Sequence, residues 1–379
     1  MAEADESIIA EIGPGVSALD ASGWDALNSA ANPFVSHAFL AALEESDSVG
    51  SGTGWSPAPL IIREGNMLLG ALPAYLKSHS QGEYVFDHAW ADAWERAGGR
   101  YYPKLQIAAP FSPVPGPRVL AHDARTALKL LKAAEALVQQ NNLSSAHATF
   151  VQEDQLGFFR DAGWLIRQGT QFHWVNQGYA DWDSFMASLS SRKRRAIRKE
   201  RAAAQSAVEI EILRGVDIRP AHMDAFWIFY QDTGARKWGR PYLTRAFFDL
   251  IVASMADDLV LFLAHKNGVP VAGALNILGP DCLYGRYWGC TQDIPFLHFE
   301  LCYYQAIDFA IAHSLHRVEA GAQGEHKLAR GYLPVPTYSA HYIPNPGFRS
   351  AIEDFLVRET RAVEREQEFL GELGPFRRG

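Results

Sequence analysis

Apolar and polar positions along this chain follow two different periods, and the changes of period mark out short helices and strands. Apolar residues three and four positions apart predict a helix over 124–140, and strict alternation predicts a strand over 208–213. A hairpin with a Lys-Asn-Gly turn is expected over 259–278, followed by a strand at 282–288. Because hairpin, further strand, loop, helix and strand occur in this order in both halves, we expect two mixed α/β units.

The remaining elements follow from the same patterns. Helices are expected at 24–27, 36–43, 182–189, 223–233, 243–255, 299–313 and 351–370, and strands at 60–62, 67–76, 104–109, 145–151, 317–320 and 337–342. The segment 78–117, which is rich in aromatic residues, Gly and Pro, is expected to be a long loop that includes one of these strands. With a boundary near 170–185, the predicted domains are 1–175 and 176–379.

Composition narrows the class of protein. The chain has 379 residues, 48% of them hydrophobic and 21% charged, which is typical of a soluble globular protein. Its acidic start does not resemble a signal peptide, and no apolar run is long enough to span a membrane. Cys282, Cys290 and Cys302 have no CxxC spacing, so neither a disulfide framework nor a metal site is predicted. We expect a cytoplasmic protein, with peripheral contact at the inner membrane as an open alternative.

A strongly basic segment stands out against the formal net charge of -8. Residues 192–201 contain seven basic residues and one acid, and they are good helix formers. A helix over 190–201 is expected, with Ser190 or Ser191 as its cap. Such a run is either a solvated face or an anion site, and phosphates are the obvious ligands. The predicted donor-binding residues are Arg192, Lys193, Arg195, Arg198 and Lys199.

Stretches throughout the chain are similar to one known family. They are SHSQGEYVFD at 78–87, GRYYPK at 99–104, the basic segment at 190–199, RKWGRPYL at 236–243, YGRYWG at 284–289, FLHFE at 296–300 and EAGAQGEHK at 319–327. In these, the chain resembles the FemAB-like family of Fem-type peptidyltransferases, described as peptidoglycan biosynthesis or recognition proteins and predicted N-acyltransferases. The resemblance implies an α/β fold of two GNAT-like domains with mixed sheets in the Fem-type tandem arrangement, and acyl transfer to an amine.

The resemblance leaves the acyl donor open. Fem enzymes use aminoacyl-tRNA, whereas GNAT enzymes use acyl-coenzyme A and hold its pyrophosphate in an Arg/Gln-x-x-Gly-x-Gly/Ala loop. The matching segment here, 289–296, has a single glycine. The expected co-substrate is therefore an acyl-CoA, an acyl carrier protein or an aminoacyl-tRNA, held partly by the basic segment, and no permanently bound cofactor is expected. The expected acceptor is an amine of a lipid or cell-envelope precursor.

The segment that leaves the predicted strand at 317–320 has the side chains that amide formation needs. A base must accept the amine proton, and a donor must stabilise the developing oxyanion. The glycines of 321–327 allow close approach to a substrate. The predicted catalytic residues are Glu319, Glu325, His326 and Lys327. The alternative is a surface loop whose charges cap helices.

Acceptor-binding residues are expected in both halves. Alternation along the strand at 282–288 places Tyr284, Arg286 and Trp288 on one face, where they can bind an anion or form a structural stack. Residues 236–240 are expected to be a cationic loop after a helix. The predicted acceptor-binding residues are Asp87, Lys104, Arg236, Lys237, Trp238, Arg286, Trp288, His298 and Glu300.

Two functions of different classes fit the sequence. The first is an N-acyltransferase that joins an activated acyl or aminoacyl group to an amine of a lipid or envelope precursor. The second is a non-catalytic module that binds RNA or peptidoglycan and retains the fold. Only the enzyme requires the cluster of acid, imidazole and amine at 319–327.

Overall fold

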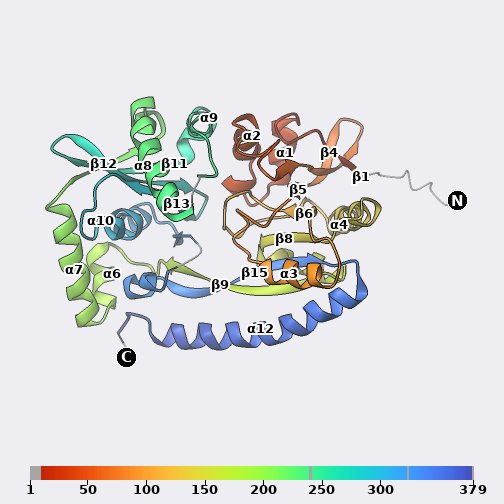
Figure 1. Ribbon diagram of the computed structural model, residues 1–379. Helices are drawn as coiled ribbons and strands as arrows, with labels where there is room; N and C mark the ends of the chain where they lie inside the picture. Colours follow the sequence, from red (N-terminus) through yellow and green to blue (C-terminus); the bar gives the residue numbers. More distant parts are fainter. Residues whose placement is uncertain (1–9, 239–240, 322–323, 378–379) are drawn as a thin grey trace. The chain divides into compact units, whose positions relative to one another are not determined.

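The computed structural model describes residues 10–238, 241–321 and 324–377, with the side chains of all of these except 233–238 and 325 (Figure 1). The chain divides into two compact units. The first comprises the residues up to Gly169 together with Thr337–Val363, and the second comprises Thr170–Pro336 and the residues from Glu364 onward. That 1–175 and 176–379 are the two domains stays a prediction. They differ from the compact units mainly in where 337–363 belongs.

The first unit contains two sheets. One is antiparallel throughout, in the order β1 (Ala10–Ile12), β3 (Leu60–Glu64), β4 (Met67–Leu72) and β7 (Leu120–Ala121). The other strands follow in the order β2 (Trp55–Pro57), β5 (Ala74–Lys77), β6 (Lys104–Ile107), β8 (Ala146–Val151) and β15 (Leu333–Tyr342). Only β6 and β8 are parallel among these, as expected of strands joined by a helical crossover.

Helix α4 (Ala124–Gln140) fills that crossover and supplies much of the first unit's core. Asp123 caps its start by accepting a hydrogen bond from the Thr126 N–H. The buried Leu130 and Val138 pack with the strand residue Ala148 in one hydrophobic cluster. The other helices of this unit are α1 (Ala21–Leu27), α2 (His37–Glu45), α3 (His88–Arg96), α5 (Leu156–Asp161) and the first part of α12 (Pro346–Glu372).

The second unit is built on one mixed sheet. Its strands follow in the order β10 (Glu209–Arg214), β11 (Leu259–Lys266), β12 (Val269–Leu278), β13 (Cys282–Cys290), β14 (Arg317–Glu319) and β9 (Leu165–Val175). The β13–β14 pair is parallel and the other pairs are antiparallel. Its helical segments are α6 (Trp182–Ser188), α7 (Ser191–Gln205), α8 (Pro220–Trp238), α9 (Arg245–Met255), α10 (Leu297–Phe299), the π-turn η5 (Glu300–Tyr304), α11 (Gln305–Ala312) and the 3₁₀ segment η6 (Glu325–Arg330).

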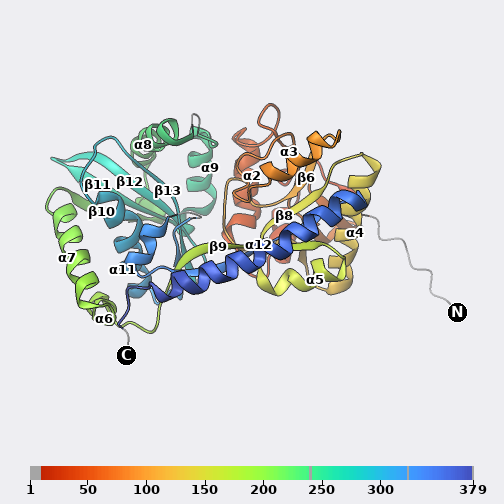
Figure 2. The same ribbon diagram turned by 60° about the horizontal axis from the view of Figure 1, so that its bottom comes forward.

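Helices cover both faces of the second sheet. α8 and α9 lie on one side of β11–β13, whereas α10 and α7 lie on the other (Figures 1 and 2). Gly289 lets α8 come close to β13, because a Cβ at this position would be 2.0 Å from the carbonyl oxygen of Phe229. The C-terminal segment lies beside the start of α7 (Figure 2), where the Ser190 N–H donates to the carbonyl oxygen of Pro375.

Both units show the same succession of strand pairs. The pairs β5–β6, β6–β8 and β8–β15 are antiparallel, parallel and antiparallel, as are β12–β13, β13–β14 and β14–β9. The last strand of the first series, β15, comes from the C-terminal half of the chain. The last strand of the second series, β9, precedes all the other strands of that series in the sequence. The predicted α/β class with mixed sheets is confirmed, and so is the repeated order of elements.

Some of the predicted elements differ from those in the structure. The predicted loop over 78–117 contains α3, which buries Trp90 and Ala91. β9 was not predicted, because its solvent-accessible first part interrupts the apolar pattern. The expected cationic loop begins inside a helix, since α8 continues to Trp238.

Candidate functional site

The strands β13 and β14 are paired over only a short distance. Their parallel pairing covers Cys282↔Arg317, Leu283↔Val318 and Tyr284↔Glu319. β14 ends there, whereas β13 continues to Cys290 in pairing with β12. The predicted catalytic segment begins at this point, so it follows the end of a buried parallel strand. Polar side chains at such strand ends are the usual positions of ligand sites in α/β proteins.

A β-bulge at Arg286 reorients the middle of β13. Leu275 lies opposite Tyr287, and Asn276 lies opposite Gly285, so Arg286 is the extra residue. Tyr284 therefore shares a face with Tyr287 rather than with Trp288, and the predicted common face of Tyr284, Arg286 and Trp288 is wrong. Bulges of this kind break the alternation that a sequence pattern assumes, and they occur often beside active sites.

Glu319 lies at the end of β14 and is only 3% exposed. Its Oε1 accepts a hydrogen bond from the Arg317 Nε at 3.0 Å, and its Oε2 is 3.8 Å from the Nε2 of His173. Within the described residues Oε2 has no hydrogen-bond partner. Burial lowers the pKa of His173, which favours the neutral imidazole. His173 comes from β9, so sequence reasoning, which did not predict that strand, missed it.

Lys327 is the amine of the predicted catalytic set, and its surroundings change its pKa strongly. It is 1% exposed, and its Nζ donates a hydrogen bond to the carbonyl oxygen of Gly321 at 2.7 Å. Burial lowers its pKa to about 7; the Cys302 thiol opposes this effect and the Arg286 cation adds to it. A lysine in this range is partly neutral at physiological pH, so it can accept a proton.

His326 is exposed beside an aromatic cluster. Its Nε2 lies 2.8 Å from the hydroxyl of Tyr303, and its ring contacts the rings of Phe299 and His298. His298 in turn packs edge-on against Trp288, with ring centroids 5.2 Å apart. The structure therefore brings one predicted acceptor residue, His298, into contact with a predicted catalytic residue, and a second, Trp288, into contact with His298. The side chain of Glu325 lies outside the described residues.

Arg330 ties this segment to helix α7. Its guanidinium donates to the carbonyl oxygen of His326 at 2.7 Å, to the Tyr304 hydroxyl at 3.0 Å and to Glu200 at 2.8 Å. It also lies over the ring of Phe299, 3.4 Å from its centroid. Sequence reasoning gave Arg330 and Glu200 no role, because their contact joins residues that are distant in the chain.

The inner side of α7 is held by a second group of contacts. Glu300 is fully buried and accepts hydrogen bonds from Arg201 at 3.2 Å, Gln205 at 2.9 Å and Gln305 at 2.8 Å. Arg201 also pairs with Asp308. These contacts are internal to the unit, and the acceptor-binding role of Glu300 stays a prediction.

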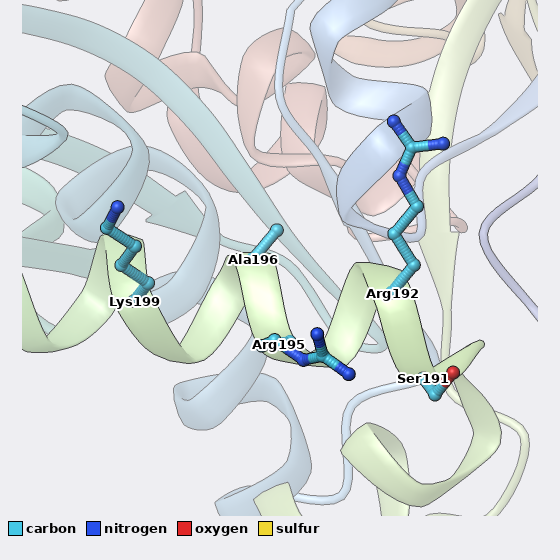
Figure 3. Close-up of a pocket in the computed structure, with 5 residues that line it drawn as sticks. All are labelled: Ser191, Arg192, Arg195, Ala196 and Lys199. Carbon is cyan, nitrogen blue, oxygen red and sulfur yellow. The ribbon is translucent and has the colours of Figure 1, made fainter.

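The outer side of α7 forms an open pocket of about 270 Å³ (Figure 3). It is lined by Ser191, Arg192, Arg195, Ala196 and Lys199, all from one face of the helix. The helix begins where it was predicted, with Ser190 at the N-cap position but without a side-chain cap bond. The five predicted donor-binding cations, Arg192, Lys193, Arg195, Arg198 and Lys199, form no ion pair with any described residue.

Asp87 and Lys104, the acceptor residues predicted in the first half, lie in an enclosed ionic cluster. Lys104 is fully buried, and its Nζ is 2.5 Å from Asp87 and 2.7 Å from Glu83. Burial acts to raise the pKa of Asp87, but the Lys104 ammonium more than offsets this effect and the pKa lies well below its usual range. Burial raises the pKa of Glu83 to about 7. The contacts of Asp87 and Lys104 are internal to the cluster, and their acceptor-binding role stays a prediction.

A buried histidine pair adjoins this cluster. The Nδ1 atoms of His147 and His341 are 2.7 Å apart, so one imidazole donates and the other accepts. Burial lowers the pKa of His147 to about 3, and burial also lowers that of His341 well below its usual value. Both rings are therefore neutral in the folded protein at pH values where an exposed histidine is charged.

This pair will make the protein acid-sensitive. A lowered folded-state pKa means that stability is present above the unfolded pKa of about 6.5 and is lost as pH falls toward the folded value. Each ring contributes a slope of up to about 1.4 kcal/mol per pH unit in this range. We expect His341→Gln to flatten the fall of unfolding free energy between pH 6 and pH 4, measured by urea denaturation. A slope equal to the wild-type slope would contradict the buried neutral pair.

The remaining predicted acceptor residues divide into two groups. Arg286 and Trp288 are half-buried on β13, near the site described above. Arg236, Lys237 and Trp238 belong to α8 by their backbone, and their side chains lie outside the described residues. In the described part of the chain, no group of three or more His, Cys, Asp and Glu residues is placed to hold a metal ion.

The chain belongs to the FemAB-like family, whose model is described as peptidoglycan biosynthesis/recognition and matches residues 15–378. No curated protein sequence matches the chain significantly. Among solved structures, FemX matches with a TM-score of 0.54 and 12% identity, over 88% of this chain and 98% of FemX. L-PGS from Bacillus licheniformis matches with a TM-score of 0.52 and 9% identity, over 89% of this chain and 98% of L-PGS. The fold is therefore two GNAT-like domains in the Fem-type tandem arrangement.

None of the helices that the structure describes is long and apolar enough to cross a membrane.

Proposed function

We propose that this protein is an N-acyltransferase that forms an amide between an activated acyl or aminoacyl group and an amine of a lipid or cell-envelope precursor. The observation that supports this most strongly is the placement of Lys327, a buried amine beside the end of β14, with Glu319, His326 and Arg286 from the same region. Membership of the FemAB-like family supports the envelope setting.

The chemistry follows from direct attack. The acceptor's nitrogen forms a bond to the acyl carbon, and the bond from that carbon to the leaving sulfur or oxygen breaks. Neutral Lys327 accepts the proton that the nitrogen loses, and the leaving thiolate or alkoxide must gain a proton. Negative charge that develops on the carbonyl oxygen requires a donor, and the half-buried Arg286 at the bulge of β13 fits that role.

The donor is an acyl-CoA, an acyl carrier protein or an aminoacyl-tRNA, all of which have anionic groups. The outer face of α7 is suited to hold such a group, because its cations have no ion-pair partner in the described residues and Ala196 leaves room between them. Its inner face is held to η5 and η6 through Glu300 and Arg330. The proposed donor-binding helix and the segment with Lys327 are therefore connected through the contacts of Arg330.

A deletion strain tests the function. Loss of the gene should remove an amide-containing lipid or envelope precursor and accumulate the corresponding free amine, with a mass difference equal to one acyl or aminoacyl group. Mass spectrometry of extracted lipids and soluble precursors measures both species. Unchanged amides and amines in all fractions, with the protein present in the parent strain, would favour the non-catalytic binding module.

Removing the outer cations of α7 will weaken donor binding. The triple change of Arg192, Arg195 and Arg198 to Gln removes three exposed charges, so donor affinity should fall about tenfold or more, and wild-type affinity should fall with added salt. Titration at 50 and 200 mM salt measures both effects. Lys266→Gln, at the exposed end of β11, is the control. Normal donor binding by the triple variant would show that the outer side of α7 is only a solvated face.

A further inference from the structure

The outer face of α7 has a charge pattern with one repeat per helical turn. Arg192, Arg195 and Lys199 are three and four positions apart, so they form a row that spans about 10 Å along the helix. All three are exposed, and Ala196 lies between them in the pocket (Figure 3). Ala202 and Ala203 extend this face with small exposed side chains.

The row is held in place from the other side. Ile197 and Ala204 are buried, and the inward Glu200 and Arg201 form the ion pairs with Arg330, Glu300 and Asp308. α7 cannot roll without breaking these contacts. A partner therefore meets a pre-oriented cationic surface, which lowers the entropic cost of binding.

This surface matches the charge pattern of another helix. A helix with Asp or Glu at positions three and four apart presents carboxylates at the same period as the cations of α7. Small side chains at Ala196, Ala202 and Ala203 allow the close approach that helix packing requires. The match in sign and spacing favours an acidic helix as the occupant.

Two other anionic partners fit this surface less well. Proteins that recognise RNA stack unpaired bases on aromatic side chains or on Arg planes, and the five residues that line the pocket, Ser, Ala, Lys and two Arg, include no aromatic side chain. Nucleic-acid-binding domains typically have a pI above about 9, whereas this chain has a pI near 5.9. A helix that lies in a lipid surface has Trp, Phe or Leu on its apolar side, whereas the apolar residues of α7 are one buried Ile and alanines.

We propose that the outer face of α7 docks the acidic helix of an acyl carrier protein, which delivers the thioester donor. This inference rests on the proposed function, of which it specifies the donor. The carrier's carboxylates pair with Arg192, Arg195 and Lys199, and a small side chain of the carrier faces Ala196. The thioester then reaches the segment with Lys327, to which Arg330 connects the helix.

Binding can be measured without turnover. The acyl carrier protein of the same organism, loaded as its palmitoyl thioester, is titrated into the full chain by calorimetry at 50 and 200 mM salt. We expect saturable binding that weakens with salt and weakens about tenfold in Arg195→Glu. Lys266→Glu, a charge reversal at the exposed end of β11 in the same unit, should change the Kd less than twofold. A carrier with one acidic helix residue changed to Lys should bind Arg195→Glu better than the unmodified carrier does.

Parallel titrations separate the alternatives. Coenzyme A, total tRNA and phosphatidylglycerol vesicles are each tested against wild type and Arg195→Glu. Binding of tRNA, coenzyme A or vesicles that requires Arg195, with no carrier binding, would overturn the proposal while leaving acyl transfer intact. Carrier binding that Arg195→Glu leaves unchanged would also overturn it. Failure of the proposed function is a separate result, since it shows in the amides of the deletion strain.

Discussion

Replacing Lys327 with Met will lower the rate of amide formation by about 10²–10⁴-fold, because a positioned base contributes roughly that factor. The wild-type rate should rise with pH through about 7, where Lys327 loses its proton, and this ascending limb should be absent in the variant. The measurement is a pH–rate profile at saturating donor, with circular dichroism to show that the variant is folded.

A second variant separates two roles of the same side chain. Lys327→Arg keeps the cation but does not deprotonate near neutral pH, so it should be as inactive as Lys327→Met if the amine accepts a proton. Substantial activity in Lys327→Arg would instead indicate a cation that stabilises the oxyanion. If Lys327→Met keeps wild-type turnover while His326→Gln or Glu319→Gln loses it, the base is one of those residues.

Lys104→Met will destabilise the protein by about 3–5 kcal/mol, since it leaves the buried Asp87 without its cation and leaves Glu83 with only the Lys77 ammonium, 3.7 Å away. This is a large part of the 5–15 kcal/mol that typically stabilises a domain. Urea denaturation at pH 7 measures the change. Lys132→Met is the matched control: the exposed Lys132 pairs with Glu135 on α4, and Glu135 keeps its hydrogen bond from the Trp164 indole, so the loss of Lys132 should cost at most about 1 kcal/mol.

The Lys104 result also tests the predicted acceptor role. A variant that is strongly destabilised, yet binds acceptor normally under conditions where it is folded, has lost a structural ion pair only. A variant within about 1 kcal/mol of wild type would contradict the enclosed ionic cluster and return Lys104 and Asp87 to the list of ligand-binding residues.

Elements with strong local periodicity were predictable from the sequence. The helix α4 matches its predicted range of 124–140, and the strands β11 to β13 lie where the alternation and the Lys-Asn-Gly turn placed them. In these segments the burial of one side follows from residue spacing, so local pattern and tertiary structure agree. The basic helix α7 was equally predictable, because its residues are helix formers and include no Gly or Pro.

Features that depend on pairing between distant segments were not predictable. Nothing in the sequence of β9 or β15 indicates which sheet it joins, since strand order depends on tertiary contacts. The bulge at Arg286 adds one residue to β13 and exchanges the faces of the residues that follow, which alternation alone cannot show. The candidate site was therefore found through its composition at 319–327, whereas His173, Glu200 and Arg330 required the folded chain.

Reconstitution with purified protein tests the central claim most directly. Extract of the deletion strain supplies the accumulated amine, acyl donors are added separately as coenzyme A thioester, carrier thioester or aminoacyl-tRNA, and mass spectrometry quantifies the amide. We predict that one donor gives many amide molecules per protein molecule with the wild-type chain and almost none with Lys327→Met. Amide that never exceeds the protein in amount, or equal product from Lys327→Met, would contradict catalysis by this site.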